Sequence, residues 1–234
     1  MTCVFVTGTD TDAGKTMAAA ALLYRLAESA VKTLAMKPVA AGAVATANGL
    51  RNSDALQLEL AMNARNVTYA EVNPICLAAP IAPHIAAEQA GIKLSVAELL
   101  RHQQRLAQHP HDLLLIEGAG GWLVPLNEVE TLADYAVAAR VKVVMVVGLK
   151  LGCINHALLT AAAIQQSGAE LVGWIGNQPQ ALAMPHQHEN LAYLQARLPA
   201  PCLGVLPFEP SADSAKLASY LLESQALMSL FAGN

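Results

Sequence analysis

Six short runs of almost continuously apolar residues constrain the fold of this chain more than any other feature of its sequence. Longer segments with helical character separate them, so strands and helices are expected to alternate. Strands buried on both faces are typical of parallel sheets that carry helices on each side. The runs lie at Cys3–Thr7, Thr33–Met36, Leu113–Ile116, Val143–Val147, Leu171–Ile175 and Cys202–Leu206. We therefore expect an α/β fold with a mostly parallel central sheet flanked by helices, as a single domain over residues 1–234.

The helices between these runs are predicted from their end signals. An Ala-rich helix is expected over residues 14–30. Ser95 and Glu98 have the spacing of a capping box, in which Glu98 reaches back to the helix start. Asn155 is expected to cap a helix that runs to Gln166, and a last helix is expected over residues 212–231.

The composition excludes several classes of protein. Hydrophobic residues make up 54% of the chain and charged residues 14%, against about 25% charged residues in a typical soluble domain. Such a chain is not disordered through low hydrophobicity. The net charge is −4 and no Lys/Arg-rich run occurs, so no nucleic-acid partner is expected. The low charge fits either a compact Ala-rich fold or a surface that a partner subunit partly covers.

No targeting or membrane signal is apparent in the sequence. The most apolar stretch, Val141–Leu151, is interrupted by lysines and is shorter than the roughly 20 residues that a spanning helix needs. We expect a cytoplasmic protein with no membrane partner. The cysteines are scattered and are predicted to be buried free thiols, at Cys3, Cys76, Cys153 and Cys202.

A glycine-containing loop follows the first apolar run and ends in Gly14-Lys15-Thr16, where a helix is expected to begin. This is the arrangement of a P-loop, in which backbone N–H groups bind phosphate oxygens. Lys15 would place a cation among the β- and γ-phosphate oxygens, and the Thr16 hydroxyl can ligate Mg²⁺. Five residues, rather than the usual four, separate Gly8 from Gly14. With a strand before it and a helix after it, the loop predicts a nucleotide-binding P-loop fold.

Acidic side chains near the expected strand ends are candidates for holding Mg²⁺. Glu117 directly follows an apolar run and precedes Gly118-Ala119-Gly120-Gly121, which resembles a Walker B position followed by a close backbone approach. Asp10, Asp12 and Asp54 are further candidates. Asp54 also stands at a plausible helix start, so capping is an alternative role for it.

A lysine follows the second apolar run. Lys37 lies where the carboxyl edge of the sheet is expected, beside the P-loop. It could act on a ligand there or be a solvated loop lysine. The segment 39–52 that comes next has no periodicity and is predicted to be a loop, at the edge where open α/β sheets bind ligands.

Beyond these single positions, the sequence is similar to the family of ATP-dependent dethiobiotin synthetases, ligases of biotin biosynthesis. Matching stretches follow one another in family order from residue 4 to about residue 208. They are Phe5–Thr11, Gly14–Thr16, Lys37–Ala40, Gly49–Ala55, Val72–Pro74, Pro83–His84, Glu117–Trp122 and Gly152–His156. The resemblance implies a P-loop ligase that works as a homodimer.

The resemblance also implies a reaction. A vicinal diamine, 7,8-diaminopelargonic acid, would form an N-carbamate with CO₂ or bicarbonate, and ATP would phosphorylate that carbamate. The second amine would then close the cyclic urea of dethiobiotin and release phosphate beside ADP. Carbamate and γ-phosphoryl group are both anionic, so cations between them offset their repulsion. Lys15 and Lys37 match the family's catalytic lysines.

Each matching residue carries an implied role. The Mg²⁺ ligands would be Thr16, Asp54 and Glu117. Asn177 would read the adenine edge within an ATP site formed by Asp12, Ala13, Gly14, Lys15, Thr16, Met17, Asp54, Glu117, Gly118, Ala119, Gly120, Asn177, Pro207, Phe208 and Glu209. The diamine would contact Thr11, Lys15 and Lys37 and, from the neighbouring subunit, Gly152, Cys153, Ile154 and Asn155. The sequence departs from common family residues at Asp12, Ala41 and Gln178.

Two other functions remain alternatives at this stage. A nucleotide-switch ATPase of the partitioning or iron-protein type shares the P-loop and the parallel sheet, and a fold does not fix a function. Such proteins commonly carry an extra lysine early in the loop, where this chain has Thr9, Asp10 and Thr11. The other alternative is a nucleotide-binding subunit without turnover, against which the set of lysines and acids argues.

Overall fold

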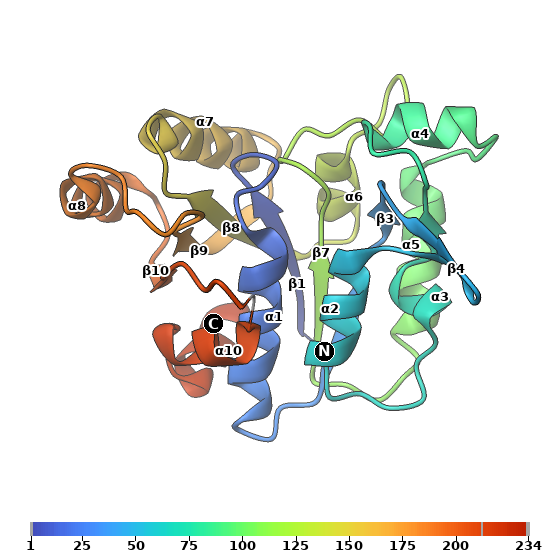
Figure 1. Ribbon diagram of the computed structural model, residues 1–234, viewed down its shortest axis with the longest axis horizontal. Helices are drawn as coiled ribbons and strands as arrows, with labels where there is room; N and C mark the ends of the chain where they lie inside the picture. Colours follow the sequence, from blue (N-terminus) through green and yellow to red (C-terminus); the bar gives the residue numbers. More distant parts are fainter. Residues whose placement is uncertain (1, 212, 233–234) are drawn as a thin grey trace.

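The computed structural model, described here for residues 2–211 and 213–232, is built around a six-stranded parallel sheet (Figure 1). Its strand order is β10-β9-β8-β1-β7-β2. The strands are β1 (Thr2–Gly8), β2 (Thr33–Met36), β7 (Leu113–Glu117), β8 (Lys142–Gly148), β9 (Glu170–Asn177) and β10 (Cys202–Leu206). All five neighbouring pairs are parallel. The predicted α/β class is confirmed, and each apolar run forms a strand.

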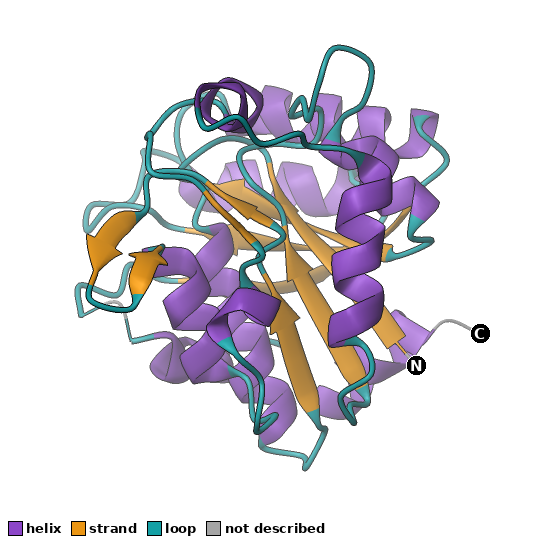
Figure 2. Cartoon of the chain, turned by 90° about the vertical axis from the view of Figure 1, so that its right-hand side faces the viewer, coloured by secondary structure: helices purple, strands orange, loops and turns teal. Residues whose placement is uncertain are grey.

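Helices cover both faces of the sheet (Figure 2). The long helices α1 and α7 follow β1 and β8, and α1 packs against α2, α9 and α10. The helices are α1 (Lys15–Ala27), α2 (Ser53–Ala61), α3 (Tyr69–Val72), α4 (Pro83–Gln89), α5 (Val96–Leu106), α6 (Leu132–Ala138), α7 (Cys153–Gln166), α8 (Gln187–Arg197), α9 (Ser214–Leu217), the 3₁₀ turn η1 (Ala218–Tyr220) and α10 (Ser224–Ala232).

The segment predicted to be a loop, 39–52, contains short strands instead. β3 (Val39–Ala40) pairs in parallel with β6 (Ile75–Cys76), and β4 (Val44–Thr46) forms an antiparallel hairpin with β5 (Gly49–Arg51). The hairpin projects from the body of the molecule (Figure 2), and all three residues of β4 are exposed. An exposed strand needs no apolar run, which explains why the sequence pattern missed it.

Two predicted helix ends are wrong in detail. Ser95 caps α5 by accepting a hydrogen bond from the Glu98 backbone N–H, but the Glu98 side chain pairs with Arg101 instead of reaching back. Helix α7 begins two residues before Asn155, after Gly152 in a left-handed conformation with φ of 94°. Gly152 adopts this conformation without a Cβ penalty, so no side-chain cap is needed to turn the chain.

The single last helix predicted over 212–231 is also wrong, and residue 212 lies outside the described residues. The chain forms α9 and η1, breaks at Leu221 and Leu222, and resumes as α10. The break is caused by tertiary pairing, because Leu221 bridges Gly204 and the Leu222 N–H donates to the Leu203 carbonyl at 2.8 Å. Pairing with the edge strand β10 outweighs local helix propensity here.

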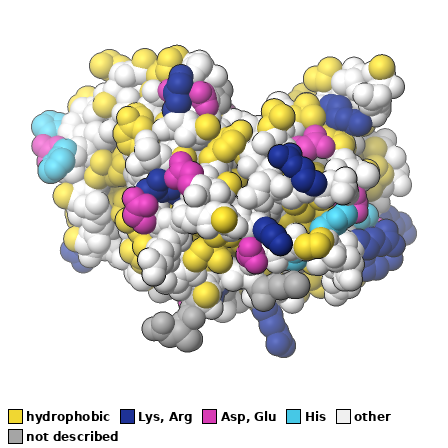
Figure 3. Space-filling model, turned by 90° about the horizontal axis from the view of Figure 1, so that it is seen from below, with side chains coloured by type: hydrophobic (Ala, Val, Ile, Leu, Met, Phe, Trp, Pro, Cys, Tyr) yellow, Lys and Arg dark blue, Asp and Glu magenta, His cyan; other side chains and the backbone are white. Residues whose placement is uncertain are grey.

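The described surface carries few charged side chains, and basic and acidic ones are interspersed. On the face drawn in Figure 3, basic and acidic side chains lie near one another among uncharged atoms. Within residues 2–211 and 213–232, no helix has the length and apolar character required to cross a bilayer. All four cysteines are free thiols as predicted, although only Cys153 is fully buried.

Candidate active site

The order of the parallel strands brings the predicted chemistry together. In a parallel sheet, all carboxyl ends lie at one edge, where ligands bind in open α/β folds. β1 leads into the P-loop, β7 ends in Glu117 and β2 is followed by Lys37. Since β1, β7 and β2 are direct neighbours, these three segments meet at adjacent positions along that edge.

The P-loop is held in shape by its own backbone and by Asn177 at the end of β9. Gly14 has φ of 90°, and a Cβ there would lie 2.0 Å from the Asn177 amide nitrogen. That amide donates to the Ala13 carbonyl at 3.1 Å. Only glycine therefore fits at position 14, and Asn177 supports the loop through its bond to the Ala13 carbonyl.

Four side chains form one ionic cluster beside the loop. Lys37 Nζ donates to Glu117 Oε1 at 2.6 Å and to the Gly118 carbonyl at 3.1 Å, and it lies 3.1 Å from Asp54 Oδ2. The Thr16 hydroxyl donates to the same Glu117 Oε1 at 2.7 Å. Glu117 is fully buried, and its other oxygen, Oε2, has no hydrogen-bond partner among the described residues.

The two lysines sit in opposite electrostatic settings. Burial, and then repulsion from Lys37, lower the pKa of Lys15, and nearby acids only partly oppose this effect. Burial also acts to lower the pKa of Lys37, but Glu117 and Asp54 outweigh it, so that pKa is raised. Lys37 is thus a firmly charged cation. Lys15 Nζ is held by the Asp10 backbone carbonyl at 3.1 Å, and it forms no direct ion pair with a carboxylate among the described residues.

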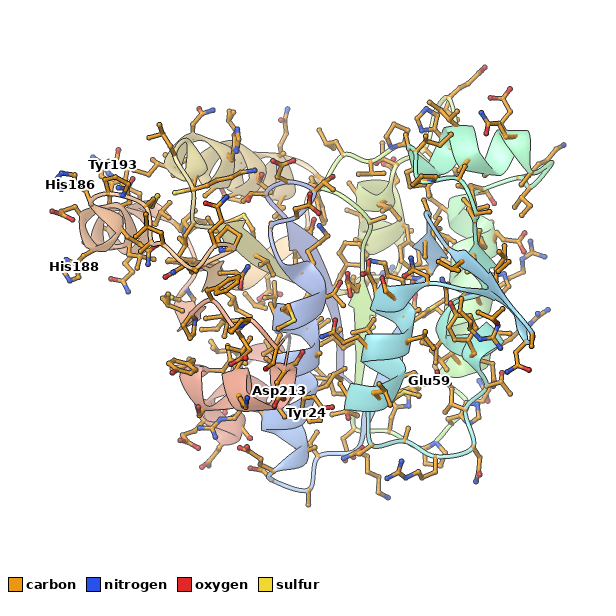
Figure 4. All side chains as sticks on the ribbon, viewed as in Figure 1. Tyr24, Glu59, His186, His188, Tyr193 and Asp213 are labelled. Atoms are coloured by element: carbon orange, nitrogen blue, oxygen red, sulfur yellow. The ribbon has the colours of Figure 1, made fainter. Side chains whose placement is uncertain are left out.

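These groups open into one large cavity of about 890 Å³. Its wall includes the predicted Thr11, Asp12, Gly14, Lys15, Thr16, Met17, Lys37, Asp54, Glu117, Ala119, Gly120, Asn177, Pro207, Phe208 and Glu209. The lining comes from segments far apart in the chain, from β1 to β10. By contrast, His188 and Tyr193 of α8, and His186 just before it, lie at the outer edge of the molecule (Figure 4).

The remaining predicted residues lie behind the wall or outside it. Ala13 is buried and contributes its carbonyl to Asn177, while the Gly118 carbonyl holds Lys37. Gly152–Asn155, at the start of α7, does not line this cavity. Sequence reasoning missed several lining residues, most of them in the segments Pro80–Pro83 and Leu123–Pro125. Their only signal was adjacency to the matching stretches Pro83–His84 and Glu117–Trp122.

The donor set is suited to Mg²⁺ in combination with a nucleotide. Among the described residues, no three His, Cys, Asp or Glu side chains gather into a complete metal site. Mg²⁺ is commonly bound by one or two carboxylates plus substrate phosphates, with water. Asp54, the Thr16 hydroxyl and the unpartnered Oε2 of buried Glu117 fit that pattern.

Known folds resemble this architecture. The MinD cell division protein of Aquifex aeolicus matches with a TM-score of 0.58 and 15% identity, covering 97% of each chain. The MinD cell division ATPase of Pyrococcus furiosus matches with a TM-score of 0.52 and 16% identity, covering 98% of this chain and 100% of that one. At such low identity the likeness establishes only the shared P-loop type of fold.

Sequence relatives are much closer. A family model described as an AAA domain matches residues 2–216. The ATP-dependent dethiobiotin synthetase BioD of Cellvibrio japonicus is 52% identical over 224 residues, covering 96% of both chains. That of Marinobacter nauticus is 46% identical over 217 residues, covering 93% of this chain and 92% of the relative. The chain therefore belongs to the P-loop family of that model and, within it, to the family of ATP-dependent dethiobiotin synthetases.

Proposed function

We propose that this chain is an ATP-dependent ligase that makes dethiobiotin from 7,8-diaminopelargonic acid and CO₂, with release of ADP and phosphate. The observation that carries the proposal is the meeting of Lys15, Lys37 and Glu117 in one cavity, in a member of this family. A switch ATPase of the partitioning type would carry its extra lysine early in the P-loop, where this chain has Thr9–Thr11, whereas the second lysine of this cavity follows β2. Residues 1–234 act as one ligase domain in this account.

ATP would lie along the carboxyl edge of the sheet. Its phosphates would meet the backbone of residues 12–16 at the start of α1, where free N–H groups and the helix dipole favour anions. The base would lie toward Asn177 and Pro207–Glu209, which line the same cavity beyond the P-loop. Lys15, lacking a carboxylate partner of its own, would bind the β- and γ-phosphate oxygens.

The diamine end of the substrate would lie near Thr11 and Lys37. One amine adds to CO₂ and loses a proton, which gives the carbamate anion. A carbamate oxygen then attacks the γ-phosphorus and ADP leaves. The second amine attacks the carbamoyl carbon and loses a proton, the C–O bond breaks, and phosphate departs with that oxygen. Lys37 and Lys15 would stabilise the negative charge spread over the transferring group.

Mg²⁺ would be held by Thr16, Asp54 and Glu117. When bound, it would supply positive charge that offsets the negative charge developing during phosphoryl transfer. Lys37 and Thr16 both donate to Glu117 Oε1, which fixes the position of the carboxylate. Among the described residues Oε2 has no hydrogen-bond partner.

In this account, a second subunit would bind the carboxylate end of the substrate. Gly152–Asn155 begins a 14-residue helix, whose N-terminal N–H groups can bind a carboxylate, yet the segment lies outside the cavity. Leu151 beside it is 96% exposed and Leu159 on the same helix 62% exposed, as expected of a surface that meets another copy of the chain. A two-fold homodimer would then bring each α7 start to the partner's cavity.

A component-omission assay tests the proposed function. ADP release should require ATP, the diamine and bicarbonate together, because the chemistry begins only when the carbamate exists. The assay follows ADP with each component left out in turn, and the chain with Lys15→Ala serves as the blank. Equal rates with and without the diamine would refute the ligase and favour a switch ATPase.

A further inference from the structure

A chain of hydrogen bonds links the backbone of Lys37 to the start of the helix that carries Asp54. It joins three elements: the exit of β2, helix α3 and the start of α2. Its linking side chains do not line the main cavity and reach it through Lys37, Asp54 and Ala41, whose carbonyl accepts from Asn52 Nδ2 at 3.2 Å. The chain therefore touches the site only through backbone positions.

At one end, the backbone of Lys37 is held on both sides. The Lys37 N–H donates to the Val72 carbonyl at 2.7 Å, and the Lys37 carbonyl accepts from Asn73 Nδ2 at 2.6 Å. Asn73 is 2% exposed, so water does not compete for these bonds. This clamp fixes where the lysine side chain leaves the strand.

At the other end, Asn52 sets the start of α2. Its Oδ1 accepts from the backbone N–H of Asp54 at 3.0 Å and of Ala55 at 3.3 Å, which makes it the helix cap. Asp54 is the second residue of α2, so this cap fixes the position of its carboxylate, which lies 3.1 Å from Lys37 Nζ.

Tyr69 connects the two ends. Its hydroxyl donates to Asn73 Oδ1 at 3.0 Å and accepts from the Asn52 backbone N–H at 2.7 Å. Burial raises the pKa of Tyr69 to about 12, so the hydroxyl keeps the proton that it donates. The Arg51 guanidinium lies 4.1 Å from the centre of the ring and holds the side chain in place.

We propose that Tyr69 and Asn73 are positioning residues that set the separation and aim of Lys37 and Asp54 through this hydrogen-bond chain. Each bond needs its particular donor and acceptor. Asn73 must donate to a carbonyl and accept from a hydroxyl at once, which neither Asp nor Leu can do. The inference rests on the proposed role of Lys37, and it assigns no contact with substrate to Tyr69 or Asn73.

The test is Tyr69→Phe, made in the native chain and in Lys37→Ala. Phenylalanine keeps the ring and its contact with Arg51 but breaks the chain at its centre. In the native chain we expect kcat at saturating substrates to fall about 10- to 100-fold, since small misplacements of a reacting group have effects of that order. The dissociation constant for ATP should stay within about twofold, because the P-loop is untouched.

The double variant separates positioning from general damage. If Tyr69 acts partly through Lys37, adding Tyr69→Phe to Lys37→Ala should lower kcat by a clearly smaller factor than in the native chain, with the remainder acting through Asp54, whereas independent effects would multiply. The matched control is Tyr193→Phe, an exposed tyrosine on α8 (Figure 4), which should change nothing. Asn73→Ser, which removes the same link from its other side, should reproduce the pattern of Tyr69→Phe.

Each outcome decides between the two proposals. The positioning role would be overturned if the native chain is active and Tyr69→Phe leaves its kcat unchanged. It would also be overturned if Tyr69→Phe lowers kcat by the same factor in Lys37→Ala as in the native chain. A native chain that cleaves ATP equally without the diamine would instead refute the proposed function. The coupling of Tyr69 to Lys37 would still be measured on that ATP cleavage.

Discussion

Replacing Lys37 with alanine is expected to lower kcat by about 100- to 1,000-fold while ATP binding changes little. The loss corresponds to about 2.7–4 kcal/mol, the range found when one positioned donor to a developing anion is removed. Lys37 directly follows β2 and is not part of the P-loop, so the backbone groups and Lys15 that would bind the phosphates remain. Initial rates with saturating diamine, bicarbonate and ATP give kcat, and calorimetric titration with ATP gives the affinity.

This substitution also removes the cation beside a fully buried carboxylate, so folding must be checked separately. Glu117 would keep only the Thr16 hydroxyl as a hydrogen-bond partner among the described contacts. Thermal unfolding of the variant, with and without ADP, shows whether the fold and the nucleotide site persist. Lys32→Ala removes an exposed lysine at the opposite end of β2 and serves as the control. Normal turnover by a folded Lys37→Ala chain would reduce Lys37 to the structural partner of Glu117.

Mixing two inactive variants is expected to restore activity. Lys15→Ala disables the phosphate site, and Gly152→Glu places an acid where the neighbouring chain's substrate carboxylate would bind. In a mixed dimer, one site carries both changes and the other carries neither. With random pairing, half of the dimers are mixed and each has one intact site of two, so activity should approach about a quarter of the native value.

The structure supplies a control for the second change. A Cβ at Gly152 meets no heavy atom within 4 Å, but φ is 94° there, so any side chain carries backbone strain. Gly152→Ala has the same strain without the charge, and it should retain most of the activity. Subunit exchange is confirmed by native mass spectrometry of the mixture. If exchange is complete and activity does not return, α7 serves the site of its own chain.

The sheet was predictable because its strands carry their own signal. Thr33–Met36 and Cys202–Leu206 were predicted with their observed bounds, since each is apolar and flanked by residues that end a strand. The β4–β5 hairpin is exposed and carries no such pattern. The break at Leu221 depends on pairing with a strand whose position only the complete fold defines.

The candidate site also has a part that the sequence predicted and a part that it could not predict. Local spacing was enough to identify Lys15 and Thr16, because a P-loop is contiguous in sequence. The contact between Lys37 and Glu117, 80 residues apart, depends on β7 lying between β1 and β2. The chain from Asn73 through Tyr69 to Asn52 was not predicted, although Val72–Pro74 was among the matching stretches. Its bonds join three segments, and apart from the bond between Tyr69 and Asn73 their partners are backbone groups, which a sequence motif does not encode.

The central claim is that a carbamate oxygen takes the γ-phosphoryl group, and an isotope experiment tests it most directly. With CO₂ labelled with ¹⁸O on both oxygens, both carbamate oxygens are labelled. One then leaves with phosphate and the other stays in the cyclic urea. Mass spectrometry within the first turnovers, before label exchanges with water, should find one ¹⁸O in each phosphate and one in each dethiobiotin. Unlabelled phosphate beside labelled dethiobiotin would mean that the carbamate is never phosphorylated, and would contradict the account.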